Sequence, residues 1–253
     1  DNTGMSAIGS DGFTVVSNNS HNKSSETYTA WCWKEDATAG FDIVTYTGND
    51  SNRTISHSLS AVPHWMMFKA RSRTDSWRVY HHKNTSAPAT DYLVLNTTDA
   101  TSDNATEFQD TVPTSSVFTL GTSGNVNRNS ETFVAYLWSE KKGFSKFGSY
   151  TGNGNADGTF IYLGFRPAWL LYKRSDDSTG RNWQIYDNKR STFNELNKRL
   201  RADTSDAETT STGIDFTSNG FKLRTSDGNY NASGATYIYM AFAESPFVNS
   251  NGI

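Results

Sequence analysis

The sequence predicts an all-β protein built from repeated units, and three observations lead to that fold class. One nine-residue pattern of β-branched and aromatic residues recurs along the chain, at residues 27–35, 132–140 and 236–244. Each copy follows a short segment that opens with phenylalanine; 105 positions separate Phe13 from Phe118, and 103 separate Phe118 from Phe221. Aromatic residues make up 13% of a chain that is only 35% hydrophobic, which suits thin sandwiches with long polar loops.

The middle copy of the pattern reads Thr-Phe-Val-Ala-Tyr-Leu-Trp-Ser-Glu, from Thr132 to Glu140. Such side chains fit a pleated, packed surface, so the run predicts a strand. Alternation places Phe133, Ala135 and Leu137 on one face and the intervening side chains on the other. Both faces are apolar, and we therefore expect a strand that is covered on both sides.

The period of about 100 residues predicts two tandem antiparallel β-sandwich units of concanavalin-A-like or jelly-roll-like type, built from a ~103-residue repeat. They would span residues 40–142 and 143–247, with a tail at 248–253. Residues 1–39 would be the last two strands of a preceding partial repeat. Two strands alone cannot bury their four large aromatic residues. We expect this segment to complete the following domain, to pair with a neighbouring subunit, or to belong to a longer polypeptide.

The remaining strands are expected in pairs, one member in each unit. The expected pairs are 41–46 with a strand around Tyr150, 65–69 with 169–173, 77–80 with 183–186, and 92–100 with 199–207. The apolar residues of the strands at 65–69 and 169–173 should be buried, and Lys69 and Lys173 at their ends should be exposed to solvent. The spacing of Phe193, Leu196 and Leu200 predicts a turn of helix at 191–197 before the last of these strands.

The bulk properties exclude several classes of partner. The net charge of −3 gives no basic field for nucleic acid, and no apolar run approaches the ~20 residues of a membrane-spanning helix. Cys32 is the single cysteine, so no intrachain disulfide can form, and it is interpreted as a small buried hydrophobe. All seven tryptophans lie on the repeated strands, which predicts that they are core residues.

The candidate chemical groups are interpreted as structural. His81 and His82 are adjacent, so on a strand they point to opposite faces; we interpret them as surface polar residues. The repeated glutamates, Glu35, Glu140 and Glu244, stand at strand ends, where an acceptor or turn anchor is expected. No pair of carboxylates has the arrangement that a glycosidase needs. We predict no catalytic residue, no metal ligand and no cofactor, and the sequence names no ligand-binding residue.

Acidic and amide-rich loops at Asp176–Asp177 and 153–157 lack the spacing of a twelve-residue calcium loop and are interpreted as turns. The same interpretation applies to the asparagines in Asn-x-Ser/Thr, which in a secreted eukaryotic protein would be glycan acceptors. These asparagines are Asn18, Asn22, Asn49, Asn52, Asn84, Asn96, Asn104 and Asn231.

Several long strings resemble a repeated β-rich domain of marine bacteriophage structural proteins. They include Gly40 to Asn49, Trp77 to His81, Tyr92 to Thr98, Phe144 to Gly154, Gly220 to Arg224 and Asn231 to Tyr239. The resemblance covers residues 8 to 247. The members of that family are mostly uncharacterised and are described as tail-fibre-like or virion-structural proteins. Some of them carry concanavalin-A-like sandwich domains upstream. The resemblance brings no catalytic residues.

The sequence and the resemblance together predict a non-enzymatic virion component: a tail fibre, an appendage or a capsid-surface protein. The expected partners are further copies of the chain, other virion proteins and host cell-surface glycans. One alternative is a lectin-like carbohydrate-binding module, with Tyr230, Tyr162 or Tyr92 as an exposed aromatic platform. A second alternative is a polysaccharide depolymerase, which needs carboxylates clustered in a groove.

Overall fold

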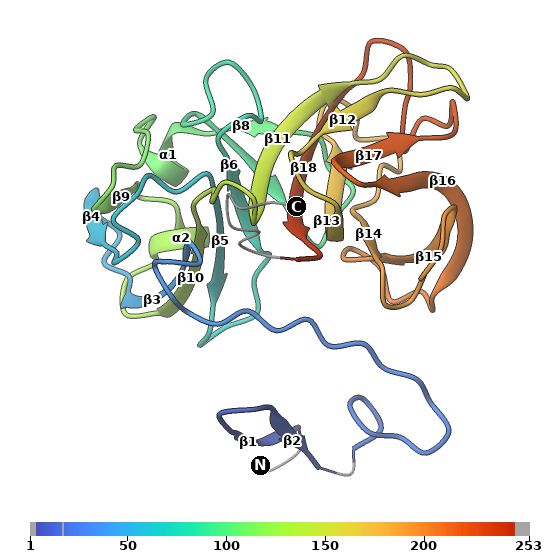
Figure 1. The fold of residues 1–253 in the computed structure, drawn as a ribbon. Helices are drawn as coiled ribbons and strands as arrows, with labels where there is room; N and C mark the ends of the chain where they lie inside the picture. Colours follow the sequence, from blue (N-terminus) through green and yellow to red (C-terminus); the bar gives the residue numbers. More distant parts are fainter. Residues whose placement is uncertain (1–3, 17, 246–253) are drawn as a thin grey trace. The chain divides into compact units, whose positions relative to one another are not determined.

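The computed structural model describes residues 4–16 and 18–245, and Figure 1 shows its fold. The chain divides into two compact units, residues 1–34 and residues 35–253. The expected sandwich units at 40–142 and 143–247 both fall within the second unit, and the expected tail at 248–253 lies outside the described residues. Within the described residues, no helix has the length and apolar character that crossing a membrane requires.

The first unit contains one two-stranded antiparallel sheet, β1 (Met5–Ile8) with β2 (Phe13–Val15). The strand expected from Phe13 is confirmed, but the strand expected at 27–35 is wrong, because those residues adopt no strand conformation. A strand persists only where neighbours complete its hydrogen-bond ladder, and β2 is paired with β1 alone. Tyr28 is 49% exposed. Cys32 is exposed as well, so its assignment as a buried hydrophobe is wrong.

The first half of the larger unit contains a six-stranded sheet. In spatial order its strands are β3 (Phe41–Thr47), β10 (Thr132–Trp138), β5 (Trp65–Ala70), β6 (Arg78–His81), β7 (Asp91–Val94) and β8 (Ser102–Asp103). All its ladders are antiparallel. The expected strand at 132–140 is therefore β10, paired on both sides, and its Phe133, Ala135 and Leu137 are fully buried.

One face of this sheet is covered by a two-stranded antiparallel sheet of β4 (Arg53–Ser56) and β9 (Val117–Leu120), with two single-turn helices, α1 (Ala105–Phe108) and α2 (Gly124–Asn127). Phe118 of β9 packs against Phe68 of β5 with ring centroids 5.5 Å apart. Asn104 and Ser123 cap the helices by accepting backbone N–H bonds. The sequence reasoning missed both helices, which are too short to show a helical period.

The second half contains an eight-stranded antiparallel sheet. In spatial order its strands are β11 (Ser145–Thr151), β18 (Thr236–Ala243), β13 (Pro167–Arg174), β14 (Gln184–Asp187), β15 (Leu196–Arg201), β16 (Thr209–Thr217), β17 (Gly220–Leu223) and β12 (Phe160–Tyr162). Phe221 of β17 contacts the rings of Tyr150 on β11 and Tyr239 on β18, so the end of the sheet folds back over its beginning and encloses a core. The helical turn expected at 191–197 is wrong, because these residues form a loop that enters β15 at Leu196.

The two sheets of the larger unit pack against each other through aromatic side chains. The ring of Trp65 on β5 lies 6.0 Å from that of Trp183 and 6.5 Å from that of Phe147. Trp183 Nε1 donates to the carbonyl oxygen of Val94 at 2.9 Å. Lys173 is also buried at this contact and does not surface as expected; its Nζ donates to Thr98 O at 3.1 Å and to Arg181 O, and burial lowers its pKa to about 8.

The expectation that the tryptophans are core residues holds for four of the seven. Trp65, Trp138, Trp169 and Trp183 are buried. Trp31, Trp33 and Trp77 are half-buried. Large aromatic side chains bury on the order of 150–250 Å² each, so the four buried indoles are major stabilising groups of the larger unit.

Candidate functional site

A buried asparagine in each half of the larger unit forms hydrogen bonds to backbone groups of other loops. It is Asn127 in the first half and Asn231 in the second. Asn127 Oδ1 accepts from Asn49 N at 3.1 Å, and its Nδ2 donates to the carbonyl oxygens of Ser51 and Gly121, both at 2.7 Å. Both Asn127 and its second-half counterpart, Asn231, are fully buried. These bonds satisfy backbone groups that would otherwise be buried without partners, so the residue is structural.

Asn231 repeats this arrangement in the second half. Its Oδ1 accepts from Asn153 N at 2.9 Å, and its Nδ2 donates to Asn155 O at 2.8 Å and to Thr225 O at 3.0 Å. The interpretation of Asn231 as a turn residue therefore understates its role, because it is buried and bonded on both sides.

A Tyr-Thr-Gly-Asn stretch occurs in both halves, at residues 46–49 and 150–153, and contacts the segment around each buried asparagine. The hydroxyls of Tyr46 and Tyr150 each donate to a carbonyl oxygen 80 residues further along the chain. A Cβ on Gly48 would lie 2.1 Å from Arg128 O, and one on Gly152 would lie 2.2 Å from Ala232 O. Only glycine permits these close approaches of backbone to backbone.

The histidines lie where the two halves meet, and the interpretation of His81 and His82 as surface residues is wrong. His81 is fully buried; its Nε2 donates to Tyr239 O at 3.3 Å and its Nδ1 accepts from Lys83 N at 2.9 Å, which fixes the neutral tautomer. His82 Nε2 donates to Phe147 O at 2.7 Å. Burial lowers the pKa of His81 well below its usual value and that of His82 to about 4.

His64 completes this group. Its ring lies 4.4 Å from that of His82, and its Nδ1 accepts from Glu140 N at 3.0 Å. Desolvation lowers the pKa of His64, although Glu140 opposes the shift. In the part of the chain that the structure describes, no three His, Cys, Asp or Glu residues converge as a metal site would require.

Glu140 and Glu244 act as acceptors just after β10 and β18, as the sequence predicts, whereas Glu35 follows no strand. Glu140 Oε1 accepts from Phe147 N of β11 at 2.7 Å, and Glu35 Oε1 accepts more weakly from Ile43 N of β3 at 3.4 Å. Glu244 accepts from Asn188 Nδ2 at 2.7 Å and forms an ion pair with Arg166 at 3.0 Å. All three carboxylates therefore serve structural contacts.

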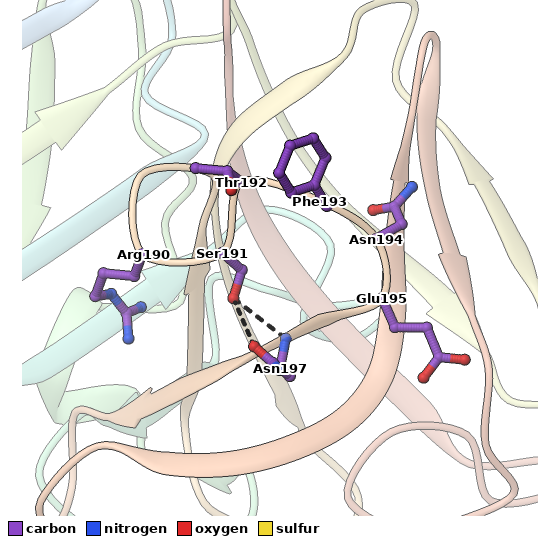
Figure 2. Close-up of a pocket in the computed structure, with 7 residues that line it drawn as sticks. All are labelled: Arg190, Ser191, Thr192, Phe193, Asn194, Glu195 and Asn197. Carbon is purple, nitrogen blue, oxygen red and sulfur yellow. Dashed lines mark hydrogen bonds between the residues drawn. The ribbon is translucent and has the colours of Figure 1, made fainter.

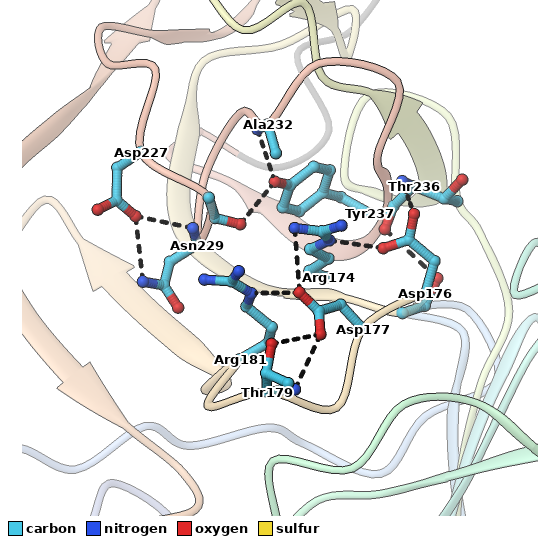
Figure 3. Close-up of polar contacts among 12 residues, drawn as sticks. Arg174, Asp176, Asp177, Thr179, Arg181, Asp227, Asn229, Ala232, Thr236 and Tyr237 are labelled. Atoms are coloured by element: carbon cyan, nitrogen blue, oxygen red, sulfur yellow. Dashed lines mark hydrogen bonds and ion pairs between the residues drawn. The ribbon is translucent and has the colours of Figure 1, made fainter.

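The acidic pair Asp176–Asp177 belongs to a network of arginines, shown in Figure 3. Arg174 Nε contacts Asp176 at 2.6 Å, and Arg181 Nε contacts Asp177 at 2.8 Å. Hydrogen bonds from Thr179 and the nearby Arg181 hold the pKa of Asp177 well below its usual range. The arginines supply the compensating positive charge, so the interpretation of this segment as a turn is supported over a calcium loop.

The three tyrosines considered as a saccharide platform have different environments. Tyr230 is 3% exposed and Tyr92 packs against the core beneath Arg78, so neither forms an exposed platform. Tyr162 is 60% exposed, with Lys146 Nζ 5.5 Å from its ring centroid. It is the member of the three that fits the expectation.

A pocket of about 470 Å³ lies at the loop between β14 and β15, and Figure 2 shows its lining. The lining residues are Arg190, Ser191, Thr192, Phe193, Asn194, Glu195 and Asn197. Phe193 is 82% exposed. The sequence reasoning missed this site because it assigned Phe193 to the apolar face of a helical turn. A single phenylalanine within the run Ser-Thr-Phe-Asn-Glu is the signal that could have indicated a loop site.

Comparison with known proteins gives one match. No curated protein and no solved structure matches this chain. A family model described as a domain of unknown function (DUF7483) matches residues 1–246. Because the match extends over nearly the whole chain, the protein belongs to the DUF7483 family.

Proposed function

We propose that this protein is a non-enzymatic structural component of a phage virion, such as a tail fibre, an appendage or a capsid-surface protein. The observation that carries the proposal is the layered packing of the larger unit. The β4–β9 pair and the two helices cover the first sheet, that sheet packs on the second, and the second folds back over itself. A stack of this kind resists local opening, because large apolar side chains are buried between its layers.

The larger unit is, in this proposal, a tandem pair of sandwiches built from a ~103-residue repeat. Matching strand orders support the repeat: β3-β10-β5-β6-β7 in the first sheet corresponds to β11-β18-β13-β14-β15 in the second. The pairing of β4 with β9 likewise corresponds to the pairing of β12 with β17. Repetition of a packed unit is a direct route to a stiff spacer, which suits a particle appendage.

Assembly with further copies is supported by the aromatic residues of the first unit. Phe13 is 43% exposed and Tyr28 is 49% exposed in a segment whose sequence matches that of two buried strands. Pairing with a neighbouring subunit would give this segment the ladder that β10 and β18 have. We also propose that a virion component of this kind contacts glycans on the host cell surface.

The experiment is to locate the protein. Antibodies against the purified full chain are used for immunogold labelling of phage particles from a lysate that contains it, and native mass spectrometry measures the subunit number of the purified chain. We expect labelled particles and a homo-oligomer. A chain that is absent from particles and strictly monomeric in solution would refute the proposal.

A further inference from the structure

The pocket beside β15 combines an exposed aromatic ring with unused polar groups. Phe193 is 82% exposed in a pocket of about 470 Å³, which lies within the range of about 300–1,000 Å³ typical of small-molecule sites. Figure 2 shows that Phe193 and Thr192 lie along one limb of the loop, while Ser191 and Asn197 are bonded to each other across it.

The exposure of Phe193 is imposed by a loop that is tied down on both sides of it. Asn194 Nδ2 donates to Phe216 O at 2.8 Å, and Asn194 Oδ1 accepts from Phe216 N at 3.0 Å. On the other side, Ser191 Oγ accepts from the backbone N–H groups of Asn197 and Lys198 at 3.2 and 3.0 Å. The ring is thus presented to solvent at a fixed place, and a preorganised site loses little entropy on binding.

The polar groups of the pocket are suited to hydroxyls. The Thr192 hydroxyl and the Glu195 carboxylate form no hydrogen bond or ion pair with the residues that the structure describes. Asn197 uses its Oδ1 to accept from Ser191, which leaves its amide nitrogen as a donor. These donors and acceptors line the same pocket as the exposed ring, and such a combination suits the hydroxyls and C–H faces of a sugar.

The charges favour a neutral ligand. Arg190 is already committed, because its guanidinium contacts Asp187 at 2.6 Å and Glu208 at 3.0 Å. Glu195 is therefore the unpaired charge of the pocket, and a negatively charged ligand would be repelled by it.

We propose that this pocket binds a neutral saccharide, with a sugar C–H face stacked on Phe193 and its hydroxyls hydrogen-bonded by Thr192, Glu195 and Asn197. Tyr162 is a second exposed aromatic residue, with 60% of its surface accessible. It does not line the pocket, and Lys146 lies beside its ring. The site does not depend on the architectural role proposed above, so either proposal can fail without the other.

The test is isothermal titration calorimetry of the full chain with neutral oligosaccharides of glucose, galactose and mannose, together with their sulfated counterparts. We expect saturable binding of at least one neutral member. Phe193→Ala should weaken it about tenfold, because the stacking contact and the apolar area buried on the ring are both lost. Phe193 is exposed, so this variant should fold normally, and a thermal melt checks that.

Two matched variants separate the site from its alternatives. Tyr162→Ala removes another exposed ring and should leave the affinity unchanged. Glu195→Gln keeps an acceptor but removes the charge, and it should narrow the preference for neutral over sulfated sugars. The proposal is overturned if no member of the panel binds, if Phe193→Ala binds as well as the unmodified chain, if Tyr162→Ala abolishes binding, or if sulfated sugars bind as tightly as neutral ones.

Discussion

The two halves of the larger unit use the same side chains inside their loops but different ones where they meet. Asn127 and Asn231 are both fully buried, and each accepts from a backbone N–H 78 residues earlier in the chain. At the meeting surface, His81 of β6 donates to Tyr239 O across the halves. Asp187 of β14 instead accepts from Lys189 N and Arg190 N of its own turn.

This difference has a physical cause. A loop junction has the same surroundings in each half, so the same residue satisfies it twice. The contact between the halves joins different surfaces of each, because Trp65 at the start of β5 meets Trp183 just before β14, so corresponding positions need not carry the same side chain there. Asn127 and Asn231 therefore belong to the packing inside each half, whereas His81 lies at the contact between the halves.

The largest effect should come from the matched asparagines. Asn231→Leu leaves backbone groups of Asn153, Asn155 and Thr225 buried without their partner, and Asn127→Leu does the same in the first half. Each change should lower the free energy of unfolding by about 3 kcal/mol or more. Urea unfolding followed by tryptophan fluorescence measures both. A large loss for one variant and none for the other would break the correspondence between the halves.

The tryptophans that open the return strands should differ in cost. Trp183 is fully buried and hydrogen-bonded to Val94 O, whereas Trp77 is half-buried and stacks on Tyr136 with centroids 6.1 Å apart. Trp183→Phe should cost about 2 kcal/mol of stability, and Trp77→Phe less than about 1 kcal/mol. Equal costs in chemical denaturation would show that the contact between the halves contributes less than its burial suggests.

The histidines at the meeting surface should make stability depend on acid. The folded chain holds the pKa of His82 near 4, while an unfolded histidine takes up its proton near pH 6.5. Between these values the unfolded state binds more protons, so stability is constant above about pH 6.5 and falls as the pH drops toward 4. The loss from His82 should be no more than about 3 kcal/mol.

A matched substitution tests that origin. His82→Asn introduces the residue found at the corresponding place in the second half, Asn188, and should flatten part of the slope of melting temperature against pH between 6.5 and 4. His57→Asn, in the loop after β4, is the control. A slope that is equally steep in both variants would place the titrating group elsewhere.

The sequence was sufficient for the elements whose pattern is local. The strand β10, whose two faces are largely buried, the return strands, and Glu140 and Glu244 just after their strands follow from alternation and position. It was insufficient where neighbours decide the outcome. His81 and Lys173 look like surface residues along their own strands, and only the packing of one sheet on the other buries them.

The pocket loop was missed for a related reason. Phe193, Leu196 and Leu200 have helical spacing, but Leu196 is fixed by its pairing with Ile214 in β15 and β16, and Asn194 is held by the backbone of Phe216. Partners from a distant strand override the local spacing. The same principle governs residues 27–35, which carry a strand sequence without a strand conformation.

That last segment gives the smallest expected effect. Tyr28 occupies the position in its copy of the pattern that Phe133 occupies in β10. Tyr28 is 49% exposed and its hydroxyl is bonded to the nearby backbone of Lys23 and Asn19, whereas Phe133 is fully buried and stacks on Tyr46. Tyr28→Ala should change the unfolding free energy of the larger unit by less than about 0.5 kcal/mol, against about 3–5 kcal/mol for Phe133→Ala. Guanidinium titrations of the dilute chain measure both. A loss of several kcal/mol for Tyr28→Ala would mean that residues 27–35 complete a sheet. Residues 27–35 and β10 would then differ in the strands with which they pair, and not in whether they pair.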